Sequence, residues 1–382
     1  MIAPATQKVG IIGAGVIGDF HAEALKAMPG AELVAAYARK DDKANAFAQQ
    51  HGCVGYSDLD QFLAHEEMSV VTVASVSGVH LEHVEAAAKA GKHIICEKPL
   101  EVTTARIDQM IKTCDEAGVM LAGIFPRRFN PSTEIFQRAI ENGRLGKVVL
   151  VDVAIKWWRS QEYYDSGAWR GTWELDGGGA LMNQSIHTID LMLHLVGPVK
   201  SVRASCGLEA HQGIEVEDVA VAMVEFANGA RGVIQASTAC YSNTGLPASI
   251  HVCGDKGSIR MCDDKFDLWD LRNPMPRDEE ILERFGVGAE QAGAGAADPN
   301  AIDFQWHQRN FEDALEALRL GEKPQVDGRE ARRAVELIEA VYDEADNRGA
   351  PTVYWLTQEF NKPARLLYDK IATVTPFIKY NR

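Results

Sequence analysis

Cysteine is scarce in this chain of 382 residues, and its seven cysteines follow no recognisable spacing. No two of them form the Cys-x-x-Cys pair that is typical of zinc ligands or redox dithiols. An odd and scattered set also disfavours the disulfide framework of small secreted proteins. We therefore expect reduced thiols in a cytoplasmic protein, and no zinc site built from cysteine.

A long apolar segment and an excess of basic residues are also lacking. No run of about 18 apolar residues is present, so we expect no membrane-spanning helix. The N-terminus carries no secretory signal pattern, because its apolar stretch from Val9 to Ile12 breaks at once into glycines. The chain has 39 Lys and Arg against 54 Asp and Glu, a net charge of -15, which argues against nucleic-acid binding.

The remaining composition is that of a globular protein of about two domains. Hydrophobic residues make up 46% and charged residues 24% of the chain, which is enough to build a core. Up to Pro126, short β-branched runs alternate with helical stretches, a pattern typical of a parallel sheet wound with helices. The predicted strands are 9–12, 32–37, 70–74, 93–96 and 119–124. The predicted helices are 16–28, 41–51, 80–90 and 103–117.

The pattern changes after Pro126, which we take as the boundary between domains 1–126 and 127–382. Successive strands without helices between them, and the hairpin signal Asn228-Gly229, predict antiparallel pairing in an α+β domain. These strands are 148–158, 201–208, 219–226, 231–236, 248–253 and 258–261, and the helices are 180–195, 300–320 and 328–347. We also predict a mobile Gly- and Ala-rich loop at 286–300, and a docked segment in the last 30 or so residues.

The strongest motif follows the first strand. Gly13-Ala14-Gly15-Val16-Ile17-Gly18 stands between that strand and a helix, the context of a dinucleotide-binding turn. Gly13 permits the tight turn, Gly15 lets the backbone approach a pyrophosphate, and Gly18 lets the helix pack closely. The first-turn amides, from Val16 and Ile17 onward, would face the phosphates. The alternative is a tight turn without a ligand.

The end of the second strand bears on the choice of nucleotide. NAD binders usually hold the adenosine ribose with an acid at this point. This chain has Ala38, Arg39 and Lys40 there, so two cations are available for a 2′-phosphate. We therefore favour NADP over NAD, although Arg39 and Lys40 could equally form a solvated loop.

Two further motifs carry polar side chains. Glu97-Lys98-Pro99 follows the strand 93–96 at its carboxyl end, where ligands bind in open parallel sheets. Asn183, His187, Asp190 and His194 share one face of the helix predicted after Gly177-Gly178-Gly179. We interpret His187 as a proton acceptor and Asn183 as a group that binds a substrate hydroxyl. A metal site of His187, Asp190 and His194, or a histidine satisfied in the core, are the alternatives.

Together these motifs resemble the Gfo/Idh/MocA oxidoreductase family, over roughly residues 7 to 345. The resemblance implies a Rossmann domain, doubly wound with a parallel sheet, followed by a domain with a large, mainly antiparallel open sheet that often mediates oligomers. It also implies that Lys98 and His187 form the central pair. Two departures are Asn183, where many members have Asp, and Ser75-Val76, where Thr-Pro is common. The residues that we assign to the cofactor on this basis, besides the glycine turn, are Ala38, Arg39, Ser75, His80, Glu97, Lys98 and Arg127.

Aromatic residues, only 8% of the chain, gather between Trp157 and Trp173. This segment precedes the glycine-rich motif and could form a substrate wall, an oligomer contact or ordinary packing. We assign to the substrate Asn183, Trp158, Tyr164, Trp169 and Arg128.

The sequence therefore predicts an NAD(P)-dependent dehydrogenase or reductase that acts on a secondary hydroxyl or ketone of a sugar, glycoside or cyclitol. We expect a homo-oligomer, a dimer or tetramer, with no nucleic-acid, membrane or metal partner. One alternative is a glycosidase that retains its cofactor and oxidises C3 transiently. The other is a nucleotide-binding protein without catalytic activity.

Overall fold

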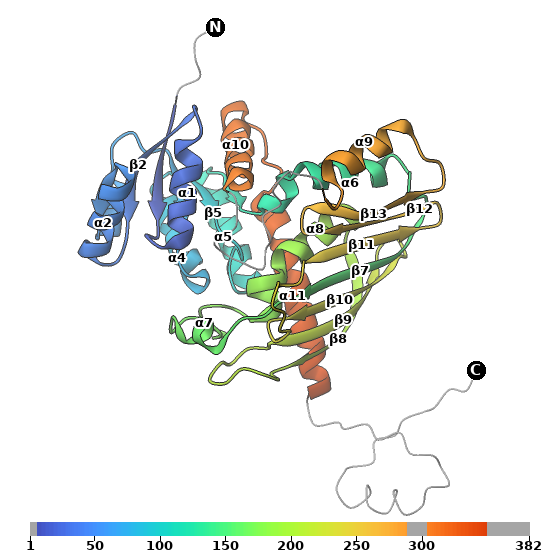
Figure 1. Ribbon diagram of the computed structural model, residues 1–382. Coiled ribbons are helices and arrows are strands. Elements are labelled where there is room, and N and C mark those ends of the chain that lie inside the picture. Colours follow the sequence, from blue (N-terminus) through green and yellow to red (C-terminus); the bar gives the residue numbers. More distant parts are fainter. Residues whose placement is uncertain (1–5, 289–303, 350–382) are drawn as a thin grey trace, which may run out of the picture. The chain divides into compact units, whose positions relative to one another are not determined.

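A computed structural model describes residues 6–288 and 304–349 of the chain. The predicted loop at 286–300 lies mostly outside these ranges, and the predicted docked segment at the C-terminus lies wholly outside them. Both sheets of the fold belong to the compact unit Met1–Ala345 (Figure 1). No helix among the described residues is long and apolar enough to cross a membrane.

The first sheet is parallel throughout, as the sequence predicts. Its six strands run in the order β3-β2-β1-β4-β5-β6, with the chain reversing direction of winding between β1 and β4. Sequence reasoning missed β3, a short strand at the sheet's edge. The strands are β1 (Gln7–Ile12), β2 (Ala31–Tyr37), β3 (Val54–Tyr56), β4 (Val70–Val73), β5 (His93–Cys96) and β6 (Leu121–Gly123).

The helices that wind this sheet begin and end where local chemistry dictates. Asp58 and Thr103 accept hydrogen bonds from backbone amides at two helix starts. Gly52 and Gly118 take the left-handed conformation at two helix ends, which glycine adopts without strain. The helices are α1 (Val16–Lys26), α2 (Asp41–His51), α3 (Leu59–Leu63), η1 (Ser77–Val79), α4 (His80–Lys89) and α5 (Thr104–Ala117).

The second sheet has seven strands in the order β13-β12-β11-β7-β10-β9-β8. All its pairs are antiparallel except that of β10 with β7, which confirms a mainly antiparallel sheet. Apolar side chains alternate along its strands between a buried and a more exposed face. The strands are β7 (Val148–Lys156), β8 (Val199–Gly207), β9 (Val219–Phe226), β10 (Arg231–Ser237), β11 (Ser249–Gly254), β12 (Gly257–Cys262) and β13 (Lys265–Leu271).

The helices after Pro126 pack on both sheets. Helix α10 returns to the first sheet, where Phe311 and Leu315 join the buried cluster of β1 and α1 (Figure 1). Gly123 of β6 also donates a hydrogen bond to Val326 O at 2.8 Å. The segment after 126 therefore does not belong to the second sheet alone. Its helices are η2 (Pro126–Phe129), α6 (Pro131–Glu141), α7 (Gln161–Asp165), η3 (Ala180–Ser185), α8 (Ile186–Val196), α9 (Pro276–Phe285), α10 (Gln305–Leu320) and α11 (Gly328–Gly349).

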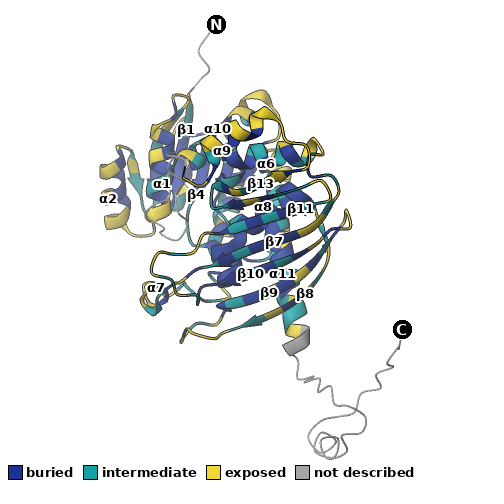
Figure 2. Cartoon of the chain, turned by 45° about the vertical axis from the view of Figure 1, so that its right-hand side comes forward, coloured by how far each residue is buried: buried dark blue, intermediate teal, exposed yellow. Residues whose placement is uncertain are grey.

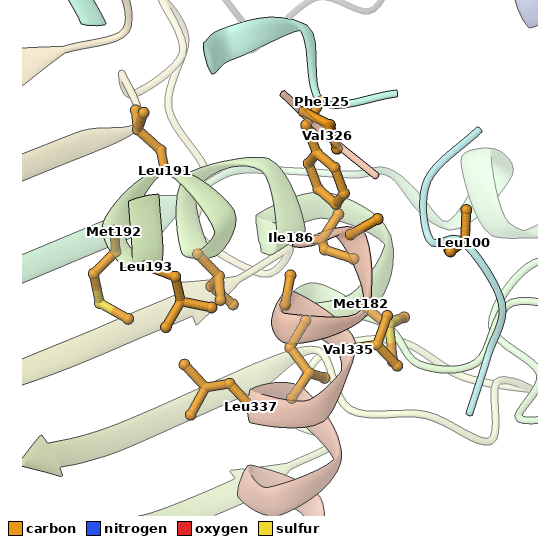
Figure 3. Packing of buried hydrophobic residues seen from close by; sticks show 14 of the residues in the cluster. Leu100, Phe125, Met182, Ile186, Leu191, Met192, Leu193, Val326, Val335 and Leu337 are labelled. Atoms are coloured by element: carbon orange, nitrogen blue, oxygen red, sulfur yellow. The ribbon is translucent and has the colours of Figure 1, made fainter. Parts of the chain in front are cut away.

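Buried residues follow the strands of both sheets, while exposed residues lie on the outer faces of α2 and α9 (Figure 2). Figure 3 shows how the segment η3–α8 is held in the core. Met182 and Ile186 lie beside Val335 of α11. Phe125, in the segment that follows β6, belongs to the same buried cluster. The segment that carries Asn183 and His187 therefore has a rigid base.

Candidate active site at the edge of the parallel sheet

The glycine turn between β1 and α1 is shaped for close approach of a ligand. Gly13 has a φ of 115°, and a Cβ there would lie 2.5 Å from Ala74 O. A Cβ on Gly18 would lie 2.1 Å from Gly13 O, so both positions exclude a side chain. Gly15, by contrast, faces open space, with no heavy atom within 4 Å of a Cβ placed there. The turn therefore fits a pyrophosphate at Gly15, beside the free amides of α1.

Apolar side chains at the mouth of this turn are left uncovered. Val16 is 66% exposed and Ile17 is 39% exposed, although both begin a helix that packs on the sheet. At the end of β2, the amide of Ala38 donates to Tyr56 O, and Arg39 and Lys40 are exposed. A nucleotide along this edge would meet both features.

The loops after β4 and β5 are tied together by a buried histidine. The two ring nitrogens of His80 lie 3.0 Å from Ser75 O and 3.1 Å from Pro99 O. The Ser75 hydroxyl lies 2.9 Å from Nδ1 of His83. His80 thus fixes the loop that carries Lys98, and Ser75 lies at the same edge.

Glu97 lies in a buried polar cluster. Nε2 of His21 is 2.9 Å from its Oε1, and the amide of Lys98 donates to its Oε2 at 3.0 Å. Burial alone would raise the pKa of Glu97, but hydrogen bonds and charge from His21 and His307 outweigh it and hold the pKa well below its usual range. Sequence reasoning missed both histidines, because they lie on α1 and α10, far from Glu97 in the chain.

Lys98 reaches across to the second motif. Its Nζ donates to the backbone oxygen of Asn183 at 2.9 Å. Burial lowers the pKa of Lys98, and the charges of Arg159 and Arg170 lower it further, while Glu97 and Asp176 oppose the shift. Burial is therefore the main cause of the shift, and charges of both signs surround the amine.

His187 is the second residue of α8, which directly follows the π-helical turn η3. The sequence predicts one regular helix over 180–195, but the structure begins with the wider π-helical turn η3, at whose start the carboxylate of Glu217 accepts from the amides of Gly179 and Leu181. Nδ1 of His187 is buried without a hydrogen-bond partner among the described residues. Burial first, and the charge of Lys98 second, hold the pKa of His187 well below its usual range. The imidazole is therefore neutral at pH 7 and able to accept a proton.

The Asn183 side chain is fixed by its neighbours. Its amide nitrogen donates to Asp176, and its Oδ1 accepts from Gln184 at 2.8 Å. Gln184 in turn donates to the Tyr163 hydroxyl at 2.9 Å and accepts from Arg159 at 2.8 Å. A side-chain amide has two donors and two acceptor positions, so Asn183 retains one of each for a ligand. Sequence reasoning named no role for Asp176, Gln184 or Tyr163.

Other predicted residues lie elsewhere. Arg128 is 2% exposed and forms a bidentate ion pair with Asp190 at 2.6 and 2.8 Å, with Glu330 at 3.2 Å. We therefore correct its expected contact with substrate to a structural ion pair. Arg127, expected near the cofactor, donates to Thr188 at 3.0 Å on the same helix as His187.

The polar residues that the sequence places on one helix face have different partners in the structure. His194 lies 3.0 Å from Oε1 of Gln137, and Asp190 belongs to the ion pair of Arg128. Within residues 6–288 and 304–349, no group of three or more His, Cys, Asp or Glu could hold a metal ion. The structure thus gives each member of the stripe a separate environment.

The aromatic segment has mixed roles. Tyr164 is 5% exposed and its hydroxyl lies 2.8 Å from Thr238 Oγ1, so it packs in the core instead of facing a substrate. Trp158 is 40% exposed and its ring meets that of Tyr241 edge to face. Trp169 stacks on the guanidinium of Arg170 at 4.5 Å. Trp158 and Trp169 remain available to a ligand.

Comparisons with known proteins agree with this arrangement. Residues 7–125 match the oxidoreductase family with an NAD-binding Rossmann fold, and residues 134–260 match the GFO/IDH/MocA C-terminal domain. The chain is 32% identical to myo-inositol 2-dehydrogenase of Thermotoga maritima, over 66% of this chain and 74% of that protein. It is 30% identical to D-glucoside 3-dehydrogenase of Escherichia coli, over 66% and 76% respectively.

Among solved structures, the WlbA dehydrogenase from Bordetella pertussis, in complex with NADH and UDP-GlcNAcA, is similar with a TM-score of 0.82. It is 33% identical, and the match covers 91% of this chain and 98% of that one. With these similarities added to the glycine turn and to the approach of Lys98 toward His187, the chain belongs to the Gfo/Idh/MocA family of NAD(P)-dependent oxidoreductases.

Proposed function

We propose that this protein moves a hydride between a nicotinamide nucleotide and a secondary hydroxyl or ketone of a sugar, glycoside or cyclitol. The observation that carries the proposal is that Lys98 Nζ donates to the backbone oxygen of Asn183 in η3, and that its charge acts on the neutral imidazole of His187 in the following helix α8. The related inositol and glucoside dehydrogenases support the same reaction class. A bound nicotinamide would supply the hydride acceptor or donor.

The glycine turn and the loops beside it would hold the nucleotide. Gly13, Gly15 and Gly18 leave room for the pyrophosphate, and the exposed Val16 and Ile17 gain an apolar cover. We infer that Ser75, His80 and Arg127 shape the nicotinamide end, His80 by fixing the loops. Glu97 would hold the loop that carries Lys98, because its carboxylate accepts a hydrogen bond from the amide of Lys98.

His187 would act as the base in the oxidation direction. Its Nδ1 is buried, which leaves Nε2 as the nitrogen that can meet the substrate hydroxyl and take its proton. Lys98 would stabilise the developing negative charge on the oxygen with its ammonium group. Asn183 would orient the sugar through its remaining donor and acceptor, with the exposed Trp158 and the partly exposed Trp169 as apolar surfaces.

The decisive experiment separates chemistry from binding. We expect His187→Ala and Lys98→Met each to lower turnover at least about 100-fold. Binding of the nucleotide, followed by its fluorescence, should change little, because the glycine turn that would hold the pyrophosphate is intact in both variants. Near-normal turnover in either variant would remove that residue from the chemistry.

We further propose that the nucleotide is NADP, on the basis of Arg39 and Lys40 at the end of β2. Asp41, the nearest acid, already accepts a hydrogen bond from Ser57. The related WlbA structure contains NADH, so the two nucleotides must be compared directly. A preference for NAD+ of about tenfold or more would refute this choice.

The two alternative functions considered from the sequence differ from a dehydrogenase in whether nicotinamide is reduced overall. A glycosidase with a retained cofactor would cleave a glycoside without net reduction of nicotinamide. A nucleotide-binding protein without activity would bind the cofactor and turn over no polyol. Assembly as a dimer or tetramer and a cytoplasmic location stay predictions, testable by light scattering and by cell fractionation.

A further inference from the structure

Arg170 lies between α7 and η3 with its guanidinium stacked on two aromatic rings. Its central carbon is 4.2 Å from the ring centre of Tyr163 and 4.5 Å from that of Trp169. Stacking engages the faces of the planar guanidinium and leaves its N–H edge available. That edge has the geometry to bind two oxygens of a carboxylate or phosphate at once.

The side chain of Arg170 forms no hydrogen bond or ion pair with the described residues, although its charge acts on the buried Asp176. Among the arginines whose side chains are described, at 6–288 and 304–346, it is the one that is half-buried and whose side chain forms no hydrogen bond or ion pair. Others without such a partner, Arg39 and Arg277 for example, are exposed, so that water solvates them. A cation that is partly removed from water costs free energy unless an anion compensates it.

Contacts connect Arg170 to the reaction centre. Tyr163, on which it stacks, accepts a hydrogen bond from Gln184, and Gln184 also donates to Asn183. The backbone oxygen of Asn183 then accepts from Lys98. The charge of Arg170 also stabilises the ionised form of Asp176, a second sign that it lies close to this network.

The acid on which the charge of Arg170 acts is already hydrogen-bonded to other groups. Asp176 accepts from the amide of Gly171 at 2.9 Å and from the side chain of Asn183. The backbone is also fixed, because the amide of Arg170 donates to Gly167 O at 3.0 Å. A preorganised cation beside a sugar site, in a chain of net charge -15, calls for a specific anion and not for general neutralisation.

We propose that Arg170 binds an oxyanion of the substrate, so that the site selects sugars that carry a carboxylate or a phosphate over neutral polyols. This inference rests on the proposed function, since it names the substrate class of the same site. Carboxylate and phosphate share the required chemistry, a planar or near-planar pair of anionic oxygens. The ligands chosen for the test below distinguish a carboxylate from a phosphate.

The test is a binding comparison on the protein saturated with NADPH or NADH, by calorimetry. The ligands are methyl α-glucopyranoside, its C6 carboxylate (the methyl glucosiduronate), glucose 6-phosphate and UDP-glucose. We expect at least one anionic sugar to bind about tenfold or more tightly than the neutral glycoside. Arg170→Gln should lose this preference and leave the neutral sugar unaffected, and Arg170→Lys should keep part of it. Arg277→Gln, an equal charge change on exposed α9, is the matched control and should keep all of it.

The identity of the tight ligand tells carboxylate from phosphate. Equal affinity for charged and neutral sugars, no measurable binding of any anionic sugar, or a preference that survives Arg170→Gln would each overturn the inference. Thermal unfolding of Arg170→Gln verifies that the variant is folded, and Arg170→Lys repeats the comparison if it is not. Because binding is read without turnover, a protein that prefers the anionic sugar yet never reduces nicotinamide would contradict the proposed function and not the role of Arg170.

Discussion

Glu217 should give the protein a pH-dependent stability that a single substitution removes. The carboxylate accepts from Gly179 N at 3.0 Å, from Leu181 N at 2.8 Å and from the Tyr342 hydroxyl at 3.0 Å. Burial raises its pKa from 4.5 to about 7, against the opposing effect of these hydrogen bonds. The group holds the glycine loop from which η3 and α8 start.

The direction in which stability changes with pH follows from the raised pKa of Glu217. The folded protein binds this proton more tightly than the unfolded chain does, so the contribution of Glu217 to stability is fully present below about pH 4.5. It is lost as the pH rises to about 7. A pKa change of this size corresponds to about 3 kcal/mol of unfolding free energy.

Glu217→Gln should therefore flatten the pH dependence of stability. Gln does not titrate, and it also loses the acceptor for Gly179, which costs about 1 to 3 kcal/mol at every pH. Urea unfolding between pH 4.5 and 7.5 should show the wild type losing about 3 kcal/mol more than the variant over this range. Glu283→Gln on exposed α9 serves as the control and should match the wild-type slope. Equal slopes for wild type and Glu217→Gln would refute the reasoning.

Three further perturbations test separate parts of the structure. Gly15→Ala should fold normally, because a Cβ there meets no atom, but it should lower the affinity for the nucleotide about tenfold or more. Gly30→Ala, where a Cβ also meets no atom, is the control and should leave the affinity measured by fluorescence titration unchanged. Arg128→Leu leaves the charge of Asp190 buried and should cost about 3 to 5 kcal/mol in urea unfolding, whereas the exposed pair of Arg138 should matter by less than about 1 kcal/mol. The pH profile of kcat/KM should have its acidic limb below pH 6.5 and its alkaline limb below pH 10.5, because the pKa values of His187 and Lys98 are both lowered. An acidic limb above pH 6.5 would contradict the environment assigned to His187.

Much of the fold can be read from the sequence, because its signals are local. The glycine turn, the β-branched strands and the hairpin Asn228-Gly229 depend on neighbouring residues, and they predict every strand of the two sheets except β3 and β13. Short elements such as β3 and α7 escape prediction, since three to five residues carry little periodicity. The return of α10 to the first sheet also escapes it, because only the tertiary contacts of Phe311 reveal the partner.

The candidate site is predictable only where a motif names it. Lys98 and His187 stand in recognisable motifs, whereas His21 acts on Glu97, which is distant in the chain. Asp176 and Arg170 contact side chains close to them in sequence, but no spacing pattern indicates those contacts. Arg128 and Tyr164 show the opposite limit. Their residue types suit a substrate, but burial against Asp190 and Thr238 gives them structural roles that spacing alone does not disclose.

Transfer of deuterium tests the central claim most directly. A panel of carbon-deuterated sugars and cyclitols, charged and neutral, would be incubated with the protein and excess NADP+ or NAD+, and the nucleotide analysed by mass spectrometry. We predict that the reduced nicotinamide gains one deuterium with at least one sugar, and that Lys98→Met and His187→Ala slow this gain at least about 100-fold. No label on the nucleotide with any member of the panel, or undiminished labelling in both variants, would contradict hydride transfer at a site built from Lys98 and His187.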